Sequence, residues 1–176
     1  MVNIKGFHGT LDEKANKILN SKFIHSSKNS EWLGSGVYFF AERKDAEWWA
    51  DLEIKKPKNI GAKAAVLVAE IITQDNNFFD FDIVANSTLF SEKVEELITV
   101  VKSKYHGKNS DAQVRHALCD WFAEKYNIDV YAYTFPIRII INNVGFPVVQ
   151  NQRQICVRND ACITNLHKYY SGGELL

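Results

Sequence analysis

The first candidate for chemistry is the segment His8-Gly9-Thr10, which closes a short apolar run near the start of the chain. It places an imidazole beside a residue that has no side chain. The backbone N–H and C=O of Gly9 can together bind a planar carboxamide, and His8 can donate a hydrogen bond to a sugar hydroxyl. This pattern predicts a binding site for a ring that bears a carboxamide and is attached to a sugar.

The second candidate is the stretch WLGSGVYFF, in which Gly34-Ser35-Gly36 precedes a strand that holds Tyr38. Glycine permits close approach to the backbone, so we expect Gly34 and Gly36 to let a ligand lie against the chain beside Tyr38. The following helix carries Trp49, which offers a flat face for a heteroaromatic ring. Taken one at a time, these residues are more typical of turns and cores; their order and proximity favour a site.

Composition sets the class of protein that must hold these residues. With 176 residues the chain is expected to form one domain, residues 1–176, and its 46% hydrophobic content predicts a globular core. Lys+Arg and Asp+Glu both number 21, so no net charge directs it to nucleic acid or membrane. Three cysteines without C-x-x-C spacing argue against a disulfide framework and a metal site. We expect a cytoplasmic protein, since no signal region or membrane span is evident.

Strand and helix patterns alternate along the chain. Thr10 is predicted to cap a helix that runs to about Leu19, with Glu13 at the capping-box offset, and Ser91 and Asp111 are predicted to begin two amphipathic helices. A further helix is expected over residues 43–54, ending before Pro57. The expected strands are residues 2–8, 37–40, 64–72, 130–135, 138–142 and 154–157. The chain therefore belongs to the α+β or α/β class, with a helical insertion at about residues 90–127.

Over residues 7–50 the sequence resembles the diphtheria-toxin and poly(ADP-ribose) polymerase branch of the ADP-ribosyltransferases. The resemblance rests on His8-Gly9-Thr10, a short helix, the segment Gly-Ser-Gly-Val-Tyr-Phe and an alanine-containing helix. It implies an α+β fold with a split β-sheet core and NAD as co-substrate. Family members use a His to hold the ribose of NAD, the next Gly to bind the nicotinamide amide and a Tyr to stack on nicotinamide. These roles pass to His8, Gly9 and Tyr38.

The resemblance also identifies supporting positions and one departure. Thr10, Gly34, Ser35 and Gly36 are expected to line the NAD site. On the next helix the family has a small hydroxyl residue and then an aromatic one; here these positions read Ala46 and Trp49, so we expect Tyr38 and Trp49 to enclose nicotinamide.

The family's catalytic Glu is replaced here, on a late strand. Gln154 is the aligned residue, and Gln152 lies on the same strand face. A glutamine offers only a dipole to the developing positive charge, which costs about 10²–10³ in rate unless another group compensates. Glu31 and Glu42 are candidates for that group. Elongation of a chain needs the carboxylate, so polymerisation is not expected.

The predicted function is therefore NAD-dependent mono-ADP-ribosyl transfer to a protein or nucleic acid. By family analogy the protein is a bacterial or phage-related toxin or defence factor, with an antitoxin or immunity protein as a further partner and no membrane partner. Two alternatives stay open: a non-catalytic NAD- or ADP-ribose-binding module, and an interaction protein that presents Trp121, Phe122 and Tyr126, although these have the spacing of a helix core.

Basic residues suggest one route to a nucleic-acid acceptor. Phosphate contacts would come from Arg153, Arg158, Lys102, Lys104, Lys108 and Arg115. Solvated helix faces explain the same residues more simply.

Overall fold

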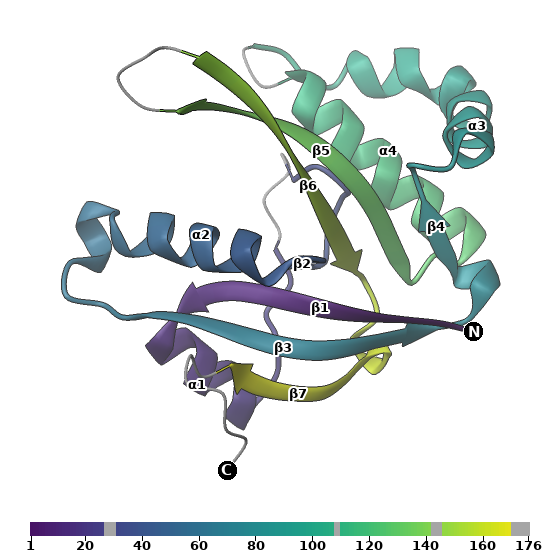
Figure 1. Ribbon diagram of the computed structural model, residues 1–176. Helices are drawn as coiled ribbons and strands as arrows, with labels where there is room; N and C mark the ends of the chain where they lie inside the picture. The colour runs from purple at the N-terminus through teal and green to yellow at the C-terminus, as the bar shows by residue number, and fades with distance from the viewer. Residues whose placement is uncertain (27–30, 108–109, 142–145, 170–176) are drawn as a thin grey trace.

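A computed structural model describes residues 1–26, 31–107, 110–141 and 146–169. Its centre is one seven-stranded sheet with the strand order β4-β5-β6-β2-β1-β3-β7 (Figure 1). All neighbouring strands are antiparallel except the pair β4 and β5. The strands are β1 (Val2–Leu11), β2 (Val37–Phe40), β3 (Ala64–Thr73), β4 (Phe78–Asp80), β5 (Val130–Ile141), β6 (Phe146–Val157) and β7 (Ile163–Tyr169).

The sheet is nearly divided between β1 and β2. Every residue of β1 is paired with β3, from Val2 to Leu11, whereas the only register between β1 and β2 joins Phe7 to Phe40. Alternate peptide groups of a strand point to opposite edges. Some of the polar backbone of residues 8–11 therefore faces the gap beside β2 rather than another strand.

Four helices cover the sheet: α1 (Asp12–Asn20), α2 (Arg43–Ile54), α3 (Val84–Lys102) and α4 (Ser110–Tyr126). The helices α1 and α2 flank the β1–β3 part, and α3 and α4 pack together beside β4 and β5 (Figure 1). Short 3₁₀ turns occur at η1 (Pro57–Asn59), η2 (Asp75–Asn77) and η4 (Asp160–Cys162). The α+β class and a helical pair between two strand-rich parts are thus present.

The predicted bounds of β2 and α2 are confirmed, but two predicted helix caps are wrong. Thr10 belongs to β1, and the N-cap of α1 is Leu11, which makes no side-chain capping bond. Glu13 pairs with Lys17 instead of completing a capping box. Ser91 lies inside α3, which begins at Val84 after Ile83, another residue without a side-chain cap. Both helices begin where the preceding strand or turn ends rather than at a capping side chain.

Three clusters of buried residues hold the layers together. One joins α1 to the sheet through Ala15, Phe39 and Leu67. The second lies under α4 and includes Phe122, Tyr131 and Cys156. The third is small and lies under α2, where Phe40, Ala46 and Val66 meet. The first and third clusters each include residues of both β2 and β3, so apolar contacts connect the two sides of the gap.

Candidate functional site

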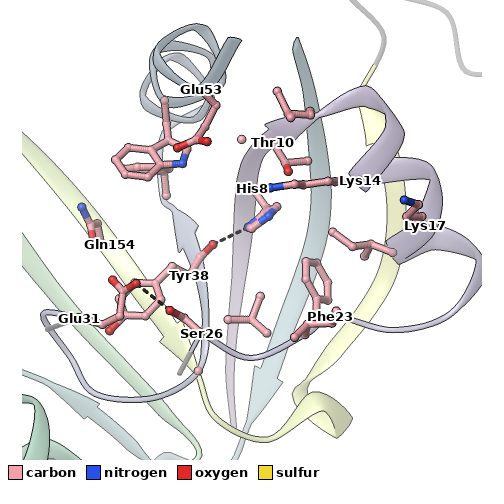
Figure 2. Close-up of a pocket in the computed structure, with 18 of the residues that line it drawn as sticks. His8, Thr10, Lys14, Lys17, Phe23, Ser26, Glu31, Tyr38, Glu53 and Gln154 are labelled. Atoms are coloured by element: carbon pink, nitrogen blue, oxygen red, sulfur yellow. Dashed lines mark hydrogen bonds between the residues drawn. The ribbon is translucent and has the colours of Figure 1, made fainter. Parts of the chain in front are cut away.

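A cavity of about 800 Å³ opens at the gap between β1 and β2. Its volume is within the range of small-molecule and cofactor sites, about 300–1,000 Å³. Seven of the predicted site residues line it: His8, Gly9, Thr10, Gly36, Tyr38, Trp49 and Gln154. Three other predicted site residues, Gly34, Ser35 and Gln152, are not among the lining residues. Figure 2 shows His8, Tyr38 and Gln154 around this one cavity.

Three adjacent strands present the three predicted catalytic residues. His8 lies on β1, Tyr38 on the neighbouring strand β2, and Gln154 on the next strand, β6, where it is opposite Phe40. Sequence separation hides this proximity, because the β2–β6 pairing joins residues more than 100 positions apart. The strand order brings His8, Tyr38 and Gln154 to one site.

His8 is held in a defined orientation and tautomer. Its Nδ1 lies 2.8 Å from the carbonyl oxygen of Tyr38, and a carbonyl oxygen only accepts, so Nδ1 carries the proton. The ring also makes edge contacts with Phe23 and Phe39 at 5.2 and 5.8 Å between centroids. Burial lowers the pKa of His8, the bond to Tyr38 opposes this effect, and Lys14 lowers the pKa further. The neutral form leaves Nε2 as an acceptor toward a hydroxyl, rather than the predicted donor.

Tyr38 contributes its ring to the wall of the cavity, and its hydroxyl is hydrogen-bonded to the protein backbone. The hydroxyl donates to the carbonyl oxygen of Gly34 at 2.7 Å and accepts from the N–H of Leu33 at 2.9 Å. Burial is the largest of the effects that raise the pKa of Tyr38 far above its ordinary value. This hydroxyl therefore closes the turn before β2 and is unsuited to proton transfer, while the ring still borders the cavity.

Gly9 has a packing reason for its identity. A Cβ at this position would lie 2.0 Å from the carbonyl oxygen of Ala46, so the backbone of α2 occupies the space above Gly9. Ala46 itself is fully buried in the cluster under α2. Gly9 lines the cavity and also lets α2 approach the sheet closely, which sets the position of Trp49 one turn farther along.

Trp49 lies at the cavity with 42% of its surface exposed. Its ring is 6.4 Å from the ring of Phe40 and 6.4 Å from that of Trp48. The ammonium of Lys56 lies 5.9 Å from its centroid. No ring contact joins Trp49 to Tyr38 among the described residues, so the two aromatic walls are separate. An exposed indole that borders a cavity is available for stacking.

The two carboxylates proposed to compensate for the glutamine, Glu31 and Glu42, differ in their access to the cavity. Glu31 lines it and accepts a hydrogen bond from the hydroxyl of Ser26 at 2.7 Å. Figure 2 shows Glu31, Ser26 and Gln154 on the Tyr38 side of the cavity. Glu42, the other candidate, is exposed at the N-cap of α2 and does not line the cavity. Glu31 is therefore the better placed of the two carboxylates.

Gln152 is turned away from the cavity to a buried carboxyl group that the sequence did not reveal. Its side chain is 1% exposed, and its amide donates to Oδ1 of Asp45 at 3.4 Å. Gln150 donates to the same oxygen at 3.0 Å, whereas the buried Oδ2 of Asp45 has no partner in the described part of the chain. Burial raises the pKa of Asp45, which the neighbouring Lys44 and the two amides only partly oppose. The prediction that Gln152 contacts a ligand directly is wrong for this geometry.

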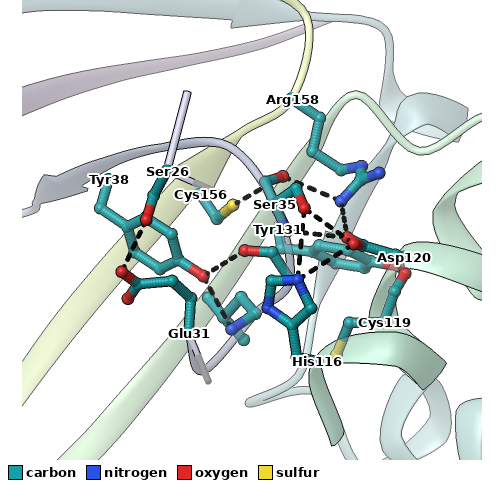
Figure 3. Close-up of polar contacts among 12 residues, drawn as sticks. Ser26, Glu31, Ser35, Tyr38, His116, Cys119, Asp120, Tyr131, Cys156 and Arg158 are labelled. Carbon is teal, nitrogen blue, oxygen red and sulfur yellow. Dashed lines mark hydrogen bonds and ion pairs between the residues drawn. The ribbon is translucent and has the colours of Figure 1, made fainter. Parts of the chain in front are cut away.

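Ser35 belongs to a polar cluster, which we call the clamp: Ser35, His116, Asp120 and Arg158 (Figure 3). The N–H and hydroxyl of Ser35 donate to Asp120 at 2.7 and 2.8 Å, and Arg158 donates to Asp120 and, at 2.9 Å, to the carbonyl oxygen of Ser35. Burial alone would raise the pKa of Asp120, but the bonds from Ser35 and Arg158 outweigh it and lower that pKa. The clamp therefore ties the turn before β2 to α4.

The clamp contains Ser, His and Asp side chains but lacks the geometry of a hydrolase triad. In a triad the carboxylate bonds to the histidine nitrogen that is remote from the serine. Here Nε2 of His116 is near both Ser35 Oγ (3.3 Å) and Asp120 Oδ2 (3.2 Å). Its buried Nδ1 has no hydrogen-bond partner among the residues described. The group is structural.

Close packing explains the two glycines in the turn: Gly34 packs against the clamp, and Gly36 packs against β6. A Cβ on Gly34, whose φ is +84°, would lie 2.4 Å from Oδ1 of Asp120, and one on Gly36 would lie 2.6 Å from Sγ of Cys156. Protein atoms thus fill the space that we expected a ligand to use at Gly34. These glycines allow close packing of the turn against α4 and β6.

Lysines form the part of the cavity lining that sequence reasoning missed. The cavity has five lysines against two glutamates, Glu31 and Glu53; the lysines are Lys14, Lys17, Lys22, Lys56 and Lys58. Lys17 pairs with Glu13 and Lys56 with Glu53. Lys14, Lys22 and Lys58 have no ion pair within the described ranges. Equal totals of acidic and basic residues concealed this local positive charge, which favours an anionic ligand.

Two of the three arginines proposed for phosphate contacts already have ion-pair partners. Arg153 bonds to Asp80 and Asp82, and Arg158 to Asp120. The guanidinium of Arg115 lies 4.4 Å from the ring centroid of Trp32. Lys108 lies outside the described residues.

The aromatic residues of α4 that were considered for a partner surface belong mainly to the core. Phe122 is buried, and Trp121 is partly buried in the same cluster.

Metal and thiol chemistry find little support in the described residues. Within them no group of His, Cys, Asp and Glu side chains is placed to hold a metal ion. Cys119, Cys156 and Cys162 are buried free thiols. Burial raises the pKa of Cys119 and of Cys156 to about 12, so both stay protonated at neutral pH. In the same part of the chain, none of the helices has the length and apolar character needed to cross a bilayer.

Comparison with known proteins gives one distant relative. No family model matches the chain, and no solved structure matches it. The chain is similar to an uncharacterized protein of Methanocaldococcus jannaschii, with 26% identity over 188 residues, covering 93% of this chain and 86% of the relative. The similarity thus extends over nearly the whole chain.

Proposed function

We propose that the protein is an NAD-dependent mono-ADP-ribosyltransferase that binds NAD in the cavity between β1 and β2. The observation that carries this proposal is the convergence of His8, Tyr38 and Gln154, from three adjacent strands, on one cavity with Gly9. The family that residues 7–50 resemble marks its core with a His, a Tyr and a Glu on three strands. An α+β fold with a nearly divided sheet is compatible with that architecture.

The cavity residues fit the parts of NAD. The backbone of Gly9 binds the nicotinamide carboxamide, and the rings of Tyr38 and Trp49 border the nicotinamide from separate walls. Neutral His8 accepts a hydrogen bond from a ribose hydroxyl through Nε2. Lys14 is near enough to His8 to lower its pKa and has no ion pair, so it provides positive charge for the pyrophosphate.

The reaction breaks the bond between ribose C1′ and the nicotinamide nitrogen. The bonding electrons leave with nicotinamide, which becomes neutral, and positive charge develops on the ribose. A lone pair of the acceptor then forms the new bond to C1′, and the acceptor releases a proton to solvent or to Glu31. Gln154 accepts a hydrogen bond from a ribose hydroxyl, and the Glu31 carboxylate supplies negative charge beside the developing cation.

The direct test measures nicotinamide released from NAD by the purified protein. We expect His8→Ala and Tyr38→Ala to lower the rate at least 10-fold, because they remove the ribose contact and one wall of the ring site. His106→Ala, an exposed histidine outside the cavity lining, is the matched control and should retain the wild-type rate. Release that persists in both cavity variants would remove the assignment.

The roles of Gln154 and Glu31 can be separated in the same assay. Gln154→Glu places a carboxylate beside the developing charge and should raise NAD hydrolysis, whereas Glu31→Gln should lower it by about 10²-fold. Gln152→Glu is the comparison, since Gln152 does not line the cavity, and it should not raise the rate. A Gln154→Glu variant that folds and shows no gain would contradict the placement of Gln154.

A non-catalytic NAD- or ADP-ribose-binding module is the second candidate, favoured by the glutamine at the third position. It predicts NAD binding with no nicotinamide release. Calorimetric titration with NAD separates the two, and Trp49→Ala should weaken binding by about 1–3 kcal/mol in either case.

A further inference from the structure

Helix α2 and the two residues that follow it, Lys55 and Lys56, present two rows of side chains, one to the cavity and one to solvent. Trp49, Glu53 and Lys56 are spaced i, i+4 and i+7 and all line the cavity. Trp48, Leu52 and Lys55 have the same spacing one residue earlier, and none of them lines it. We call this second set the outer row. Trp48 is 36% and Leu52 37% exposed, and Lys55 is exposed.

The outer row leads into a basic connection between α2 and β3. Residues 55–63, KKPKNIGAK, contain four lysines and no acidic residue. Lys55, Lys58 and Lys63 are exposed and have no ion pair among the described residues, and Ile60 is 86% exposed. Lys58 also lines the cavity, so the basic connection is continuous with its mouth.

This positive charge exceeds what NAD requires. The pyrophosphate of NAD bears two negative charges, which Lys14 and the other cavity lysines can meet. The outer row and basic connection place additional lysines outside the cavity, beside an exposed indole. Lysines that follow a backbone and aromatic rings that stack on bases are together the features of single-stranded nucleic-acid sites.

We propose that the outer row and the basic connection bind two or three nucleotides of a single-stranded nucleic acid, which is the acceptor for ADP-ribose. The proposal rests on the proposed function. Trp48 and Lys55 are about 10 Å apart along the helix axis. A base stacks on Trp48, while Lys55, Lys58 and Lys63 bind successive phosphates, and the strand passes the mouth of the cavity at Lys58. A nucleophilic oxygen or nitrogen of the strand attacks C1′ and gives up its proton, as nicotinamide leaves with the bonding electrons.

The binding experiment uses a fluorescein-labelled 12-nucleotide oligothymidylate and fluorescence anisotropy without NAD. Lys55→Gln combined with Lys63→Gln should lower the salt slope of the binding constant by about 1.4, since each phosphate contact contributes about 0.7. If binding is equal at 1 M salt, this change corresponds to about 25-fold weaker binding at 0.1 M salt. Trp48→Ala should weaken binding by about 5- to 150-fold.

The matched control is the Lys102→Gln/Lys104→Gln variant, which removes two exposed lysines at the end of α3 and should leave binding and salt slope unchanged. Equal weakening by both double variants would overturn the proposal, because binding would then depend on total charge. A 12-residue polyglutamate that competes as well as unlabelled oligothymidylate would also overturn it and would favour an acidic protein partner.

Nicotinamide release separates this proposal from the proposed function. Lys55→Gln/Lys63→Gln and Trp48→Ala, at residues outside the cavity lining, should keep NAD hydrolysis without acceptor within about twofold of wild type, and should lose transfer to the oligonucleotide. Oligonucleotide binding that depends on these residues, in a protein that never releases nicotinamide, would contradict the proposed transferase activity. It would leave the proposed nucleic-acid-binding surface intact. Release from NAD with no lysine-dependent oligonucleotide binding would contradict the surface alone.

Discussion

The polar groups on the two sides of the turn before β2 differ in whether they have partners within the protein. On the α4 side, Ser35, Asp120 and Arg158 bond to one another. On the cavity side, Lys14, Lys22 and Lys58 have no ion pair within the described ranges, and Nε2 of His8 remains an acceptor. This difference indicates where a ligand is expected. In the clamp, Ser35, Asp120 and Arg158 satisfy one another's polar groups, whereas the cavity leaves cations and an imidazole to be satisfied by a ligand.

The carboxyl groups of Asp120, which is partly buried, and Asp45, which is buried, extend this comparison. Asp120, in the clamp, has a lowered pKa because the Ser35 and Arg158 bonds exceed the effect of burial. Asp45, which belongs to the cavity-lining helix α2 but is not itself part of the lining, has a raised pKa because burial exceeds the effect of Lys44 and the glutamine amides. The two regions should therefore respond to pH with opposite signs.

The largest expected effect comes from Gly9→Ala on the cavity side. The new Cβ would meet the backbone oxygen of Ala46 at 2.0 Å, so α2 must move, at a cost of about 3 kcal/mol or more in the free energy of unfolding. Urea denaturation measures this loss. Gly61→Ala is the control: no atom lies within 4 Å, and its positive φ predicts a loss of about 1 kcal/mol. Equal losses would show that α2 does not press on Gly9.

On the clamp side, Asp120→Asn should cost about 2 kcal/mol at pH 7, because Arg158 and Ser35 lose a charged acceptor. Asp111→Asn, at the start of the same helix, should cost less than about 1 kcal/mol. The folded pKa of Asp120 is lowered, so its stabilisation is complete above the ordinary value of 3.8 and is lost as the pH falls through the folded value. The free energies of unfolding of wild type and Asp120→Asn should converge in acid. A difference that does not change with pH would show that the charge of Asp120 does not contribute to stability.

Tyr38→Phe tests whether the hydroxyl of Tyr38 acts in the turn or in the cavity. It removes the bonds to Leu33 and Gly34 but keeps the ring, so we expect a loss of about 1–2 kcal/mol with NAD binding retained. Tyr133→Phe, at a partly buried ring, is the matched control and should change stability by less than about 0.5 kcal/mol. Loss of NAD binding in a folded Tyr38→Phe protein would give the hydroxyl a role in the cavity.

The smallest effect is expected for Asp45→Asn. Because burial raises the folded pKa, the carboxyl favours the folded state most below its ordinary pKa of 3.8, and this contribution declines as the pH rises through the folded value. The variant should therefore gain up to about 1 kcal/mol relative to wild type between pH 4 and pH 8. A relative stability that falls over this range would reverse the assigned direction.

Local patterns predicted the elements that contain their own signals. The strand Val37–Phe40 follows a glycine turn, and the helix Arg43–Ile54 ends before Pro57, so both sets of bounds were correct. The start of α3 was missed because Ile83 offers no capping side chain. The edge strand Ile163–Tyr169 was missed because half-exposed polar residues conceal it until β3 pairs with it.

The site residues likewise differ in how far the sequence could predict them. His8, Gly9, Tyr38 and Trp49 are close in sequence, and their shared cavity was foreseeable from motif order. The bonds of Ser35 to Asp120, 85 positions away, and of Gln152 to Asp45, 107 positions away, depend on tertiary packing. Neither residue type nor spacing signals such contacts, so Ser35 and Gln152 were assigned to a ligand rather than to the protein.

Lys56 rests over the face of Trp49 while it is paired with Glu53. A ring that enters to stack on Trp49 can push the ammonium aside without leaving it isolated, since the carboxylate retains it. The indole face that attracts this ammonium also prefers a positively charged ring to a neutral one. A pyridinium would consequently bind more strongly than the uncharged pyridine left after cleavage. The neutral ring would then dissociate from Trp49, and the ammonium of Lys56 would return to the indole face.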